Sequence, residues 1–268
     1  MHGTGNDFIL IDNTSEIIDP ANHKFFRKIC QRHFGVGADG VMLLEKSSSN
    51  DFLLRYYNSD GRPGEMCGNG ARCAIWLAYH LNLSPQSCHF EINQKVYSGK
   101  IISSNSVRLG MKETKILLTR PELGSIIMEP FNNGMWIEVG VPHLVLTGEF
   151  SLKELDIIHW GKYYRNHIEF KPKGTNVNFV YPNESQHTIM ARVYERGVEN
   201  ETLACGTGAI ASAAFFYKNF KWPSPINVEQ PGGKLSVEFS NGFKDIFLTG
   251  PVAVVFEGDL NISSLEKD

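Results

Sequence analysis

Short runs of apolar and β-branched residues, bounded by turn residues, recur along the whole chain and predict many strands. In the first half, these runs lie at residues 8–12, 41–45, 52–57, 89–93, 96–103 and 107–111. In the second half, they lie at residues 135–139, 143–147, 177–181, 188–195, 226–229, 234–239, 243–248 and 252–256. The pattern predicts an α+β fold in which sheet predominates.

Capping residues and apolar positions at helical spacing predict a few helices between these strands. The first helix is expected to begin at Asp19 as its N-cap, with Pro20 at the first helical position, and to end near Gly35. Further helices are expected over residues 70–81, from the capping box at residues 151–154, and over residues 207–217.

The order of predicted elements repeats in two halves of the chain. Cys67-Gly-Asn-Gly-Ala71 and Cys205-Gly-Thr-Gly-Ala209 hold equivalent places, each between a strand and a helix. Residues 113–124 contain no clear strand and are expected to link the halves. The simplest explanation is two related domains, whose equivalent loops would meet at one cleft, where ligands usually bind. The domains expected are residues 1–113, joined by a last strand at about 252–268, and residues 114–251.

Length and charge narrow the range of partners. The 268 residues suffice for one large domain or two of ordinary size. Lys and Arg number 26 against 29 Asp and Glu, a net charge of −3 with no basic block, so nucleic acid is not an expected partner. No apolar run approaches the ~18 residues that span a bilayer, and the N-terminus shows no signal-peptide pattern. The expected partner is a small molecule, and the expected compartment is the cytoplasm.

The five cysteines do not form a metal site or a disulfide framework by their spacing. None lies in C-x-x-C spacing, and the histidines do not group with them as zinc ligands do. Reduced thiols, as in a cytosolic protein, are therefore expected. Cys30, Cys73 and Cys88 fall at positions that predict burial in the core, as is usual for a lone cysteine.

Cys67 and Cys205 are the candidate catalytic residues. Each precedes a glycine-rich helix start, where the backbone turns tightly and its N–H groups form an anion site suited to a carboxylate. A cysteine at that place is near the positive end of the helix dipole, which lowers a thiol pKa below its usual ~8.5. One such segment is weak evidence because glycine-flanked helix starts are common. The presence of two at equivalent places favours a catalytic role for both thiols.

Two thiols on either side of one carbon suit the inversion of a stereocentre. One thiolate removes a proton from one face, and the other thiol returns a proton to the opposite face. The α-proton of an amino acid is a very weak acid, so the carbanion needs help. Helix N-termini that hold the α-carboxylate in a site without water can supply it. The sequence shows no specific sign of a pyridoxal-phosphate lysine, which favours an epimerase without a cofactor.

The motifs together resemble the diaminopimelate epimerase family, nearly from end to end. The matching segments are Met1-His-Gly-Thr-Gly-Asn-Asp-Phe8, Asn58-Ser-Asp-Gly61, Met66-Cys-Gly-Asn-Gly-Ala-Arg72, Val193-Tyr-Glu-Arg-Gly197 and Ala204-Cys-Gly-Thr-Gly208. The resemblance implies two pseudo-symmetric domains, each a mostly antiparallel sheet wrapped around a central helix, with the last strand rejoining the first domain. It also implies interconversion of LL- and meso-diaminopimelate, on the route to lysine and peptidoglycan, and it is compatible with a homodimer.

The resemblance also assigns roles to individual residues. Cys67 and Cys205 match the acid/base pair, and His143 and Glu195 match positions that tune the thiol pKa values. The residues that match substrate contacts are Asn6, Asn58, Gly68, Asn69, Asn176, Glu195, Arg196, Gly206 and Thr207. Gly40 and Val141 depart from the Gln and Asn that many family members carry in substrate recognition, which bears on fine specificity.

Other functions remain open at the level of sequence. Racemases of the proline racemase or hydroxyproline epimerase type also use paired cysteines in glycine-rich loops, but they lack the Glu-Arg-Gly and Gly-Asn-Asp-Phe surroundings found here. Phenazine-pathway isomerases share the fold and lack the two cysteines. A thiol redox sensor or an amino-acid-binding module would use one exposed thiol with a resolving partner and has no reason to duplicate an anion site.

Overall fold

The computed structural model describes residues 1–111, 116–119, 123, 126–240 and 243–262. The chain forms two compact units. The first unit comprises Met1–Gly110 and Gly250–Asp268, and the second comprises Met111–Thr249. Within the described residues, no helix is both long enough and apolar enough to cross a membrane.

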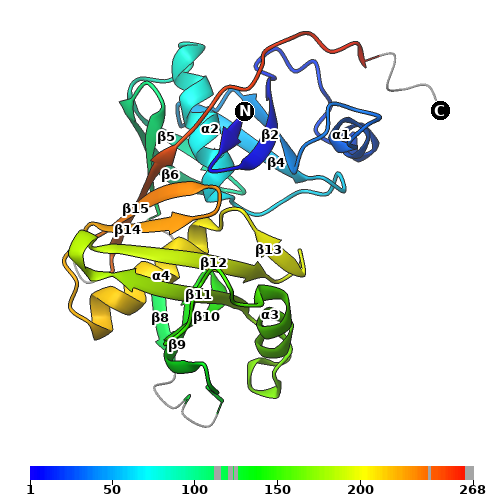
Figure 1. Ribbon diagram of the computed structural model, residues 1–268. Coiled ribbons are helices and arrows are strands. Elements are labelled where there is room, and N and C mark those ends of the chain that lie inside the picture. Colours follow the sequence, from blue (N-terminus) through cyan, green and yellow to red (C-terminus); the bar gives the residue numbers. More distant parts are fainter. Residues whose placement is uncertain (112–115, 120–122, 124–125, 241–242, 263–268) are drawn as a thin grey trace. The chain divides into compact units, whose positions relative to one another are not determined.

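The first unit is a sheet that packs around one helix, α2 (Figure 1). Its strands neighbour one another in chain order: β1 (His2–Gly3), β2 (Asn6–Asp12), β3 (Gly40–Glu45), β4 (Phe52–Asn58), β5 (Ser87–Ile92), β6 (Lys95–Ser103) and β7 (Ser106–Gly110). The pairs β2/β3 and β4/β5 are parallel, and the other pairs are antiparallel. Helix α2 (Gly68–His80) packs against β1, β2, β3, β6 and β7, while α1 (His23–Cys30) packs against β3 and β4.

The second unit surrounds helix α4 in the same way (Figure 1). Its strands are β8 (Ile116–Thr119), β9 (Phe131–Val139), β10 (Val141–Gly148), β11 (Asn176–Asn183), β12 (Thr188–Glu195), β13 (Asn200–Thr202), β14 (Ile226–Gln230), β15 (Gly233–Ser240) and β16 (Asp245–Pro251). Their order in the sheet is β16-β15-β14-β12-β11-β10-β9-β8, with β13 beside β12. The helices are α3 (Ile157–Arg165), α4 (Gly206–Asn219) and the short 3₁₀ turns η1 (Ile168–Phe170) and η2 (Glu184–Gln186).

The two units repeat one topology. The first runs β2-α1-β3-β4-α2-β5-β6-β7, and the second runs β10-α3-β11-β12-α4-β14-β15-β16. The parallel pairs also correspond, because β10/β11 and β12/β14 are parallel in the places of β2/β3 and β4/β5. The predicted α+β class, with a mostly antiparallel sheet around a central helix in each half, is confirmed.

Small residues allow the strands to approach both central helices. Ala71, Ala74 and Ala78 are buried on α2, and a Cβ atom at Gly70 would overlap the side chain of Met42. Alanines fill the same role on α4, at positions 209, 211, 213 and 214. Protein interiors are packed closely, so bulkier residues would push the sheet away from the helix and displace its first turn.

The first helix begins later than the sequence predicted. Asn22 caps α1, and its side chain accepts a hydrogen bond from the Phe25 N–H at 3.0 Å. The predicted cap, Asp19, instead accepts from the Ala21 N–H at 2.9 Å and closes a turn ahead of the helix. Both residue types make such local bonds, so the sequence alone did not decide between them. The prediction of an Asp19 cap and of a helix reaching Gly35 was wrong.

The capping box at Ser151 does not open a helix. Its carbonyl oxygen accepts from two following N–H groups in an isolated turn, and α3 is capped instead by Asp156. The Arg192 guanidinium accounts for the break, because Nη1 donates to the carbonyl oxygens of Leu152 and Leu155 at 2.8 and 3.3 Å. Those carbonyls are then occupied by a side chain from a distant strand.

The predicted linker and last strand also differ from the structure. Part of the linker forms β8, which pairs with β9, and the rest of residues 113–124 lies outside the described residues except Leu123. The strand predicted at 252–256 is absent, since β16 ends at Pro251 and only Ala253 forms a bridge, to His2. Strand β1 is only two residues long, so the C-terminal segment can form only a short pairing with it.

Candidate active site

Cys67 lies at the start of the central helix of the first unit. It is the N-cap residue of α2 in extended conformation, with φ −105° and ψ 116°, and its side chain is partly exposed. Its Sγ atom lies 3.6 Å from Oδ1 of Asn6. The first N–H groups of α2 follow directly, at Gly68 and Asn69, where the positive end of the helix dipole lies. The thiol therefore lies at the N-terminus of this helix, where the motif predicted it.

Asn6 is held in place by an acidic neighbour. Its amide nitrogen donates to Oδ2 of Asp39 at 2.7 Å, which turns its oxygen toward the thiol. Asp39 is itself joined to Asp7 and Arg32, whose guanidinium contacts both carboxylates. Burial raises the pKa of Asp39. The acidic and basic partners of Asn6 were not identified from the sequence, because they come from a different loop.

A buried arginine lies behind the Cys67 helix start. Arg72 is fully buried and donates to Gly68 O, Thr4 Oγ1 and Asn69 Oδ1 at 3.1 to 3.2 Å. All these acceptors are uncharged, and within the described residues Arg72 makes no ion pair with a carboxylate. Burial lowers the pKa of Arg72 to about 10, while the negative charge that Cys73 and Cys67 can carry acts in the opposite direction. Since burial raises the pKa of Cys73 to about 12, the thiolate that this cation can favour is that of Cys67.

Cys205 holds the corresponding place in the second unit. It caps α4, and its sulfur accepts from the Gly208 N–H at 3.3 Å and lies 3.5 Å from Thr207 Oγ1. Gln230 fixes the backbone here, accepting from the Cys205 N–H at 2.8 Å and donating to its carbonyl oxygen at 3.2 Å. A side chain at Gly208 would lie 2.5 Å from Asn178 Oδ1 and 3.2 Å from the sulfur, so glycine is required.

Glu195 lies beside Cys205 at the end of β12. Burial, the largest cause, raises the pKa of the Glu195 carboxyl, while hydrogen bonds with Thr202 and Cys205 act in the opposite direction. A carboxyl whose pKa is raised in contact with a thiol can exchange a proton with it more readily than an exposed one. Of the two thiols, it is therefore Cys205 that Glu195 contacts.

His143 is fully buried and uncharged at neutral pH. Burial lowers the pKa of this imidazole to about 3, and a repulsive contribution from Arg196 acts in the same direction. Its Nε2 atom lies 3.0 Å from Thr207 Oγ1, which in turn contacts the Cys205 sulfur. His143 is therefore linked to the Cys205 thiol through the Thr207 hydroxyl, and it acts there as a neutral ring.

The buried His143 gives the protein a specific acid sensitivity. Its pKa in the folded state is below the ordinary 6.5, so the unfolded chain takes up a proton that the folded chain does not. The contribution of neutral His143 to the free energy of unfolding is therefore fully present above pH 6.5 and decreases as the pH falls. We expect this residue to remove about 2 kcal/mol of unfolding free energy between about pH 8 and pH 5. Urea unfolding of His143→Asn should show a pH dependence flatter by that amount, and an unchanged slope would contradict the assignment.

Asn176 and Arg196 lie next to His143. The Arg196 N–H donates to Asn176 Oδ1 at 2.8 Å, and the Asn176 amide nitrogen lies 3.3 Å from His143 Nε2. The Arg196 guanidinium donates to the Lys173 carbonyl oxygen at 3.3 Å and makes no ion pair with the described residues. Its remaining donors suit a carboxylate from a ligand.

Not every predicted residue joins these clusters. Asn58 is exposed at the end of β4, where its backbone closes a turn with Gly61, and its side chain makes no hydrogen bond with described residues. Gly40 is its register partner across β3 and β4. Val141 begins β10 opposite Val139.

The other three cysteines are core residues, as predicted. Cys30, Cys73 and Cys88 are each less than 5% exposed. Burial raises the pKa values of Cys30 and Cys73 to about 12 and that of Cys88 to about 11. These thiols stay protonated and out of reach.

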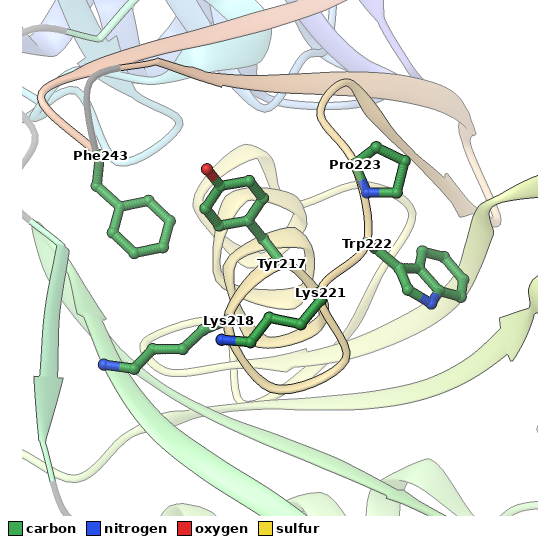
Figure 2. Close-up of a pocket in the computed structure, with 6 residues that line it drawn as sticks. All are labelled: Tyr217, Lys218, Lys221, Trp222, Pro223 and Phe243. Atoms are coloured by element: carbon green, nitrogen blue, oxygen red, sulfur yellow. The ribbon is translucent and has the colours of Figure 1, made fainter.

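The surface hollows of the second unit lie away from Cys205. One of about 440 Å³ is walled by aromatic rings and two lysines near the C-terminal end of α4: Tyr217, Lys218, Lys221, Trp222, Pro223 and Phe243 (Figure 2). Cys205 caps the opposite end of this 14-residue helix, roughly 20 Å away at 1.5 Å per residue. Among the described residues, no group of His, Cys, Asp and Glu could hold a metal ion.

Solved structures define the fold class. A phenazine biosynthesis protein of the PhzF family from Bacillus anthracis has a TM-score of 0.69 at 13% identity, over 95% of each chain. A hydroxyproline epimerase from Agrobacterium vitis, solved with bound trans-4-hydroxy-L-proline, has a TM-score of 0.63 at 13% identity, over 93% of this chain and 87% of that one. The fold is that of the PhzF proteins and of epimerases of this kind.

Sequence comparison then gives the family. The diaminopimelate epimerase family model matches residues 1–106 and 135–255. A diaminopimelate epimerase from Aquifex aeolicus (strain VF5) is 40% identical, over 99% of this chain and 98% of that one. The chain belongs to the diaminopimelate epimerase family and is an isomerase, which confirms the resemblance found in its motifs.

Proposed function

We propose that this protein interconverts LL- and meso-diaminopimelate by inverting one α-carbon, with Cys67 and Cys205 as the acid/base pair. One observation supports the two-thiol mechanism above all. In each of two topologically equivalent units, a cysteine caps the central helix. The family match supports the substrate. A redox sensor or binding module has no need for two such helix starts.

In this mechanism one sulfur is a thiolate and removes the α-proton, and the other is a thiol and donates a proton to the opposite face. The roles exchange when the reaction runs backwards. The substrate α-carboxylate is held by N–H groups at the helix starts, supplied by Gly68, Asn69, Gly206 and Thr207. Their dipoles favour the negative charge that develops as the proton leaves. No cofactor is needed for these steps.

The surrounding residues have supporting roles in the proposal. Asn6 and Glu195 contact the two sulfurs and stabilise their required protonation states. Asn176, Asn58 and Arg196 bind the polar groups at the other end of the substrate. Since a planar guanidinium forms two parallel bonds to a carboxylate, Arg196 is assigned the distal carboxylate.

We also propose that the two units are the equivalent domains expected from the sequence, and that the reaction serves lysine and peptidoglycan precursor synthesis in the cytoplasm. Dimer formation is left to hydrodynamic measurement. The activity is tested with purified protein and LL-diaminopimelate, without added cofactor, by chromatographic separation of the stereoisomers. Appearance of the meso isomer supports the proposal. Racemisation of proline with no reaction of diaminopimelate would replace it with the proline racemase alternative.

Arg196 provides a test of substrate recognition. Arg196→Lys keeps the charge but loses the fork, so we expect kcat/KM for diaminopimelate to fall about 10- to 100-fold. The matched control is Arg27→Lys, because Arg27 is an exposed arginine of α1, in the first unit. Steady-state kinetics decide the point. Equal kcat/KM in Arg196→Lys and the control would remove Arg196 from the substrate site.

A further inference from the structure

The two ring nitrogens of His143 face different neighbours. Nδ1 lies 3.1 Å from the amide nitrogen of Asn178. Nε2 lies 3.0 Å from Thr207 Oγ1 and 3.3 Å from the amide nitrogen of Asn176. A neutral imidazole carries its hydrogen on one nitrogen only, so these neighbours decide which nitrogen donates and which accepts.

The orientation of the Asn178 amide is fixed by the backbone. Its nitrogen also donates to the Leu144 carbonyl oxygen at 3.2 Å, so the amide oxygen cannot occupy that position. That oxygen instead points toward Gly208, is buried and makes no hydrogen bond. Leaving the Asn178 oxygen without a hydrogen bond costs free energy. In this orientation the amide nitrogen makes two hydrogen bonds, to Leu144 and His143. The nitrogen facing His143 is therefore a donor, and Nδ1 must accept.

The other ring nitrogen then carries the hydrogen. Nε2–H donates to Thr207 Oγ1, its closer neighbour. The Asn176 amide is oriented by the Arg196 N–H, which donates to its oxygen at 2.8 Å, so its nitrogen presents a second donor to Nε2 at 3.3 Å, farther away than Thr207 Oγ1 at 3.0 Å. A ring nitrogen has one in-plane direction for a hydrogen bond, which Thr207 occupies.

The hydroxyl of Thr207 links His143 to the Cys205 thiol. Because its oxygen accepts from His143, its hydrogen points elsewhere, and the Cys205 sulfur lies 3.5 Å away. The Gly208 N–H donates to the same sulfur at 3.3 Å. Hydrogen bonds donated to a sulfur favour its thiolate form.

We propose that Asn178 is a positioning residue that fixes the tautomer of His143, so that the Thr207 hydroxyl donates a hydrogen bond to the Cys205 sulfur. Within the second unit, Asn178, His143 and Thr207 connect the Leu144 carbonyl oxygen to the thiol through successive hydrogen-bond contacts. It rests on the proposed function only in taking Cys205 as a thiolate during the reaction.

The tautomer is measured directly on the wild-type protein. With ¹⁵N-labelled histidine, the chemical shifts of the ring nitrogens distinguish a protonated from a bare nitrogen. His143 is recognised as the ring that does not titrate near neutral pH. We expect a bare Nδ1 and a protonated Nε2. A protonated Nδ1 overturns the proposal, and this result does not depend on activity or on any variant folding.

The link to the thiol is measured by alkylation of Cys205 with iodoacetamide over a range of pH, followed by peptide mass spectrometry. Asn178→Leu removes the amide at similar volume, and Thr207→Val removes the hydroxyl but keeps the N–H. We expect both to move the midpoint of Cys205 alkylation upward by about one pH unit, and the double variant to match the single ones. Thr207→Ser should behave as wild type.

Thr188→Val is the matched control, since Thr188 is a buried hydroxyl in the same unit whose bond goes to the Gln186 carbonyl oxygen. An Asn178→Leu midpoint equal to that of the control overturns the proposal. If the alkylation shift and the tautomer are found but diaminopimelate does not react, the proposed function fails and the positioning role of Asn178 stands.

Discussion

Cys67→Ala and Cys205→Ala should each lower kcat by about 10³- to 10⁴-fold in both reaction directions. Every turnover needs both a base and an acid, so loss of either stops the sequence of proton transfers. For the same reason, the double variant should be no slower than either single variant. Conversion of LL- to meso-diaminopimelate, and the reverse, is followed at saturating substrate.

The control for this experiment is Cys88→Ala. Cys88 is buried like Cys205 but lies in strand β5 and not at a helix start. It should keep wild-type activity after a modest loss of stability, on the order of 1 kcal/mol from a small cavity. A Cys67 or Cys205 variant that keeps more than a few per cent of wild-type rate would contradict a two-thiol mechanism.

Arg72→Met should have the second largest effect. The guanidinium is buried behind the Cys67 helix start without a carboxylate partner among the described residues, so its charge favours a thiolate there. Removing it should lower kcat/KM about 10- to 100-fold and move the midpoint of Cys67 alkylation upward by about one pH unit or more. Arg72→Lys, which keeps the charge, should recover most of the alkylation midpoint.

Thermal unfolding separates this role from a purely structural one. Arg72→Met removes a costly buried charge but leaves the side-chain oxygens of Thr4 and Asn69 with fewer donors, so a moderate loss of stability is expected in any case. An unchanged alkylation profile of Cys67, together with a lowered melting temperature, would show that Arg72 supports packing alone.

The helix starts after the two cysteines could be predicted from the sequence because their signal is local. Glycines and small residues directly after Cys67 and Cys205 predict helix starts, and the helices begin within two residues of the predicted positions. One such segment is weak evidence for a catalytic cysteine, and the presence of two at equivalent places strengthened the prediction. Local signals did not locate the start of α1, because Asp19 and Asn22 are both suitable N-cap residues. Which of them caps the helix depends on how the following turn packs.

The supporting residues could not be found in this way. Arg72 lies within the Met66–Arg72 motif, four residues after Gly68, so its side chain lies on the same helix face as Gly68. This spacing is a sequence signal that could have predicted its contact with the helix start. Asn178 looks like an ordinary strand residue, and its role depends on the register of β10 with β11. Gln230 reaches Cys205 only because β14 returns beside α4. Such contacts between distant segments carry no local pattern.

The central claim, a proton removed by one thiol and returned by another, is tested most directly by the fate of the α-hydrogen. LL-diaminopimelate is converted in deuterated water without added cofactor, and the reaction is stopped early. A thiol that has taken the substrate hydrogen cannot return it to the opposite face, and the second thiol carries solvent deuterium. We predict that the inverted carbon of the meso product carries deuterium while the remaining LL isomer keeps its hydrogen. A meso product that retains the original hydrogen at the inverted carbon would contradict the two-thiol mechanism.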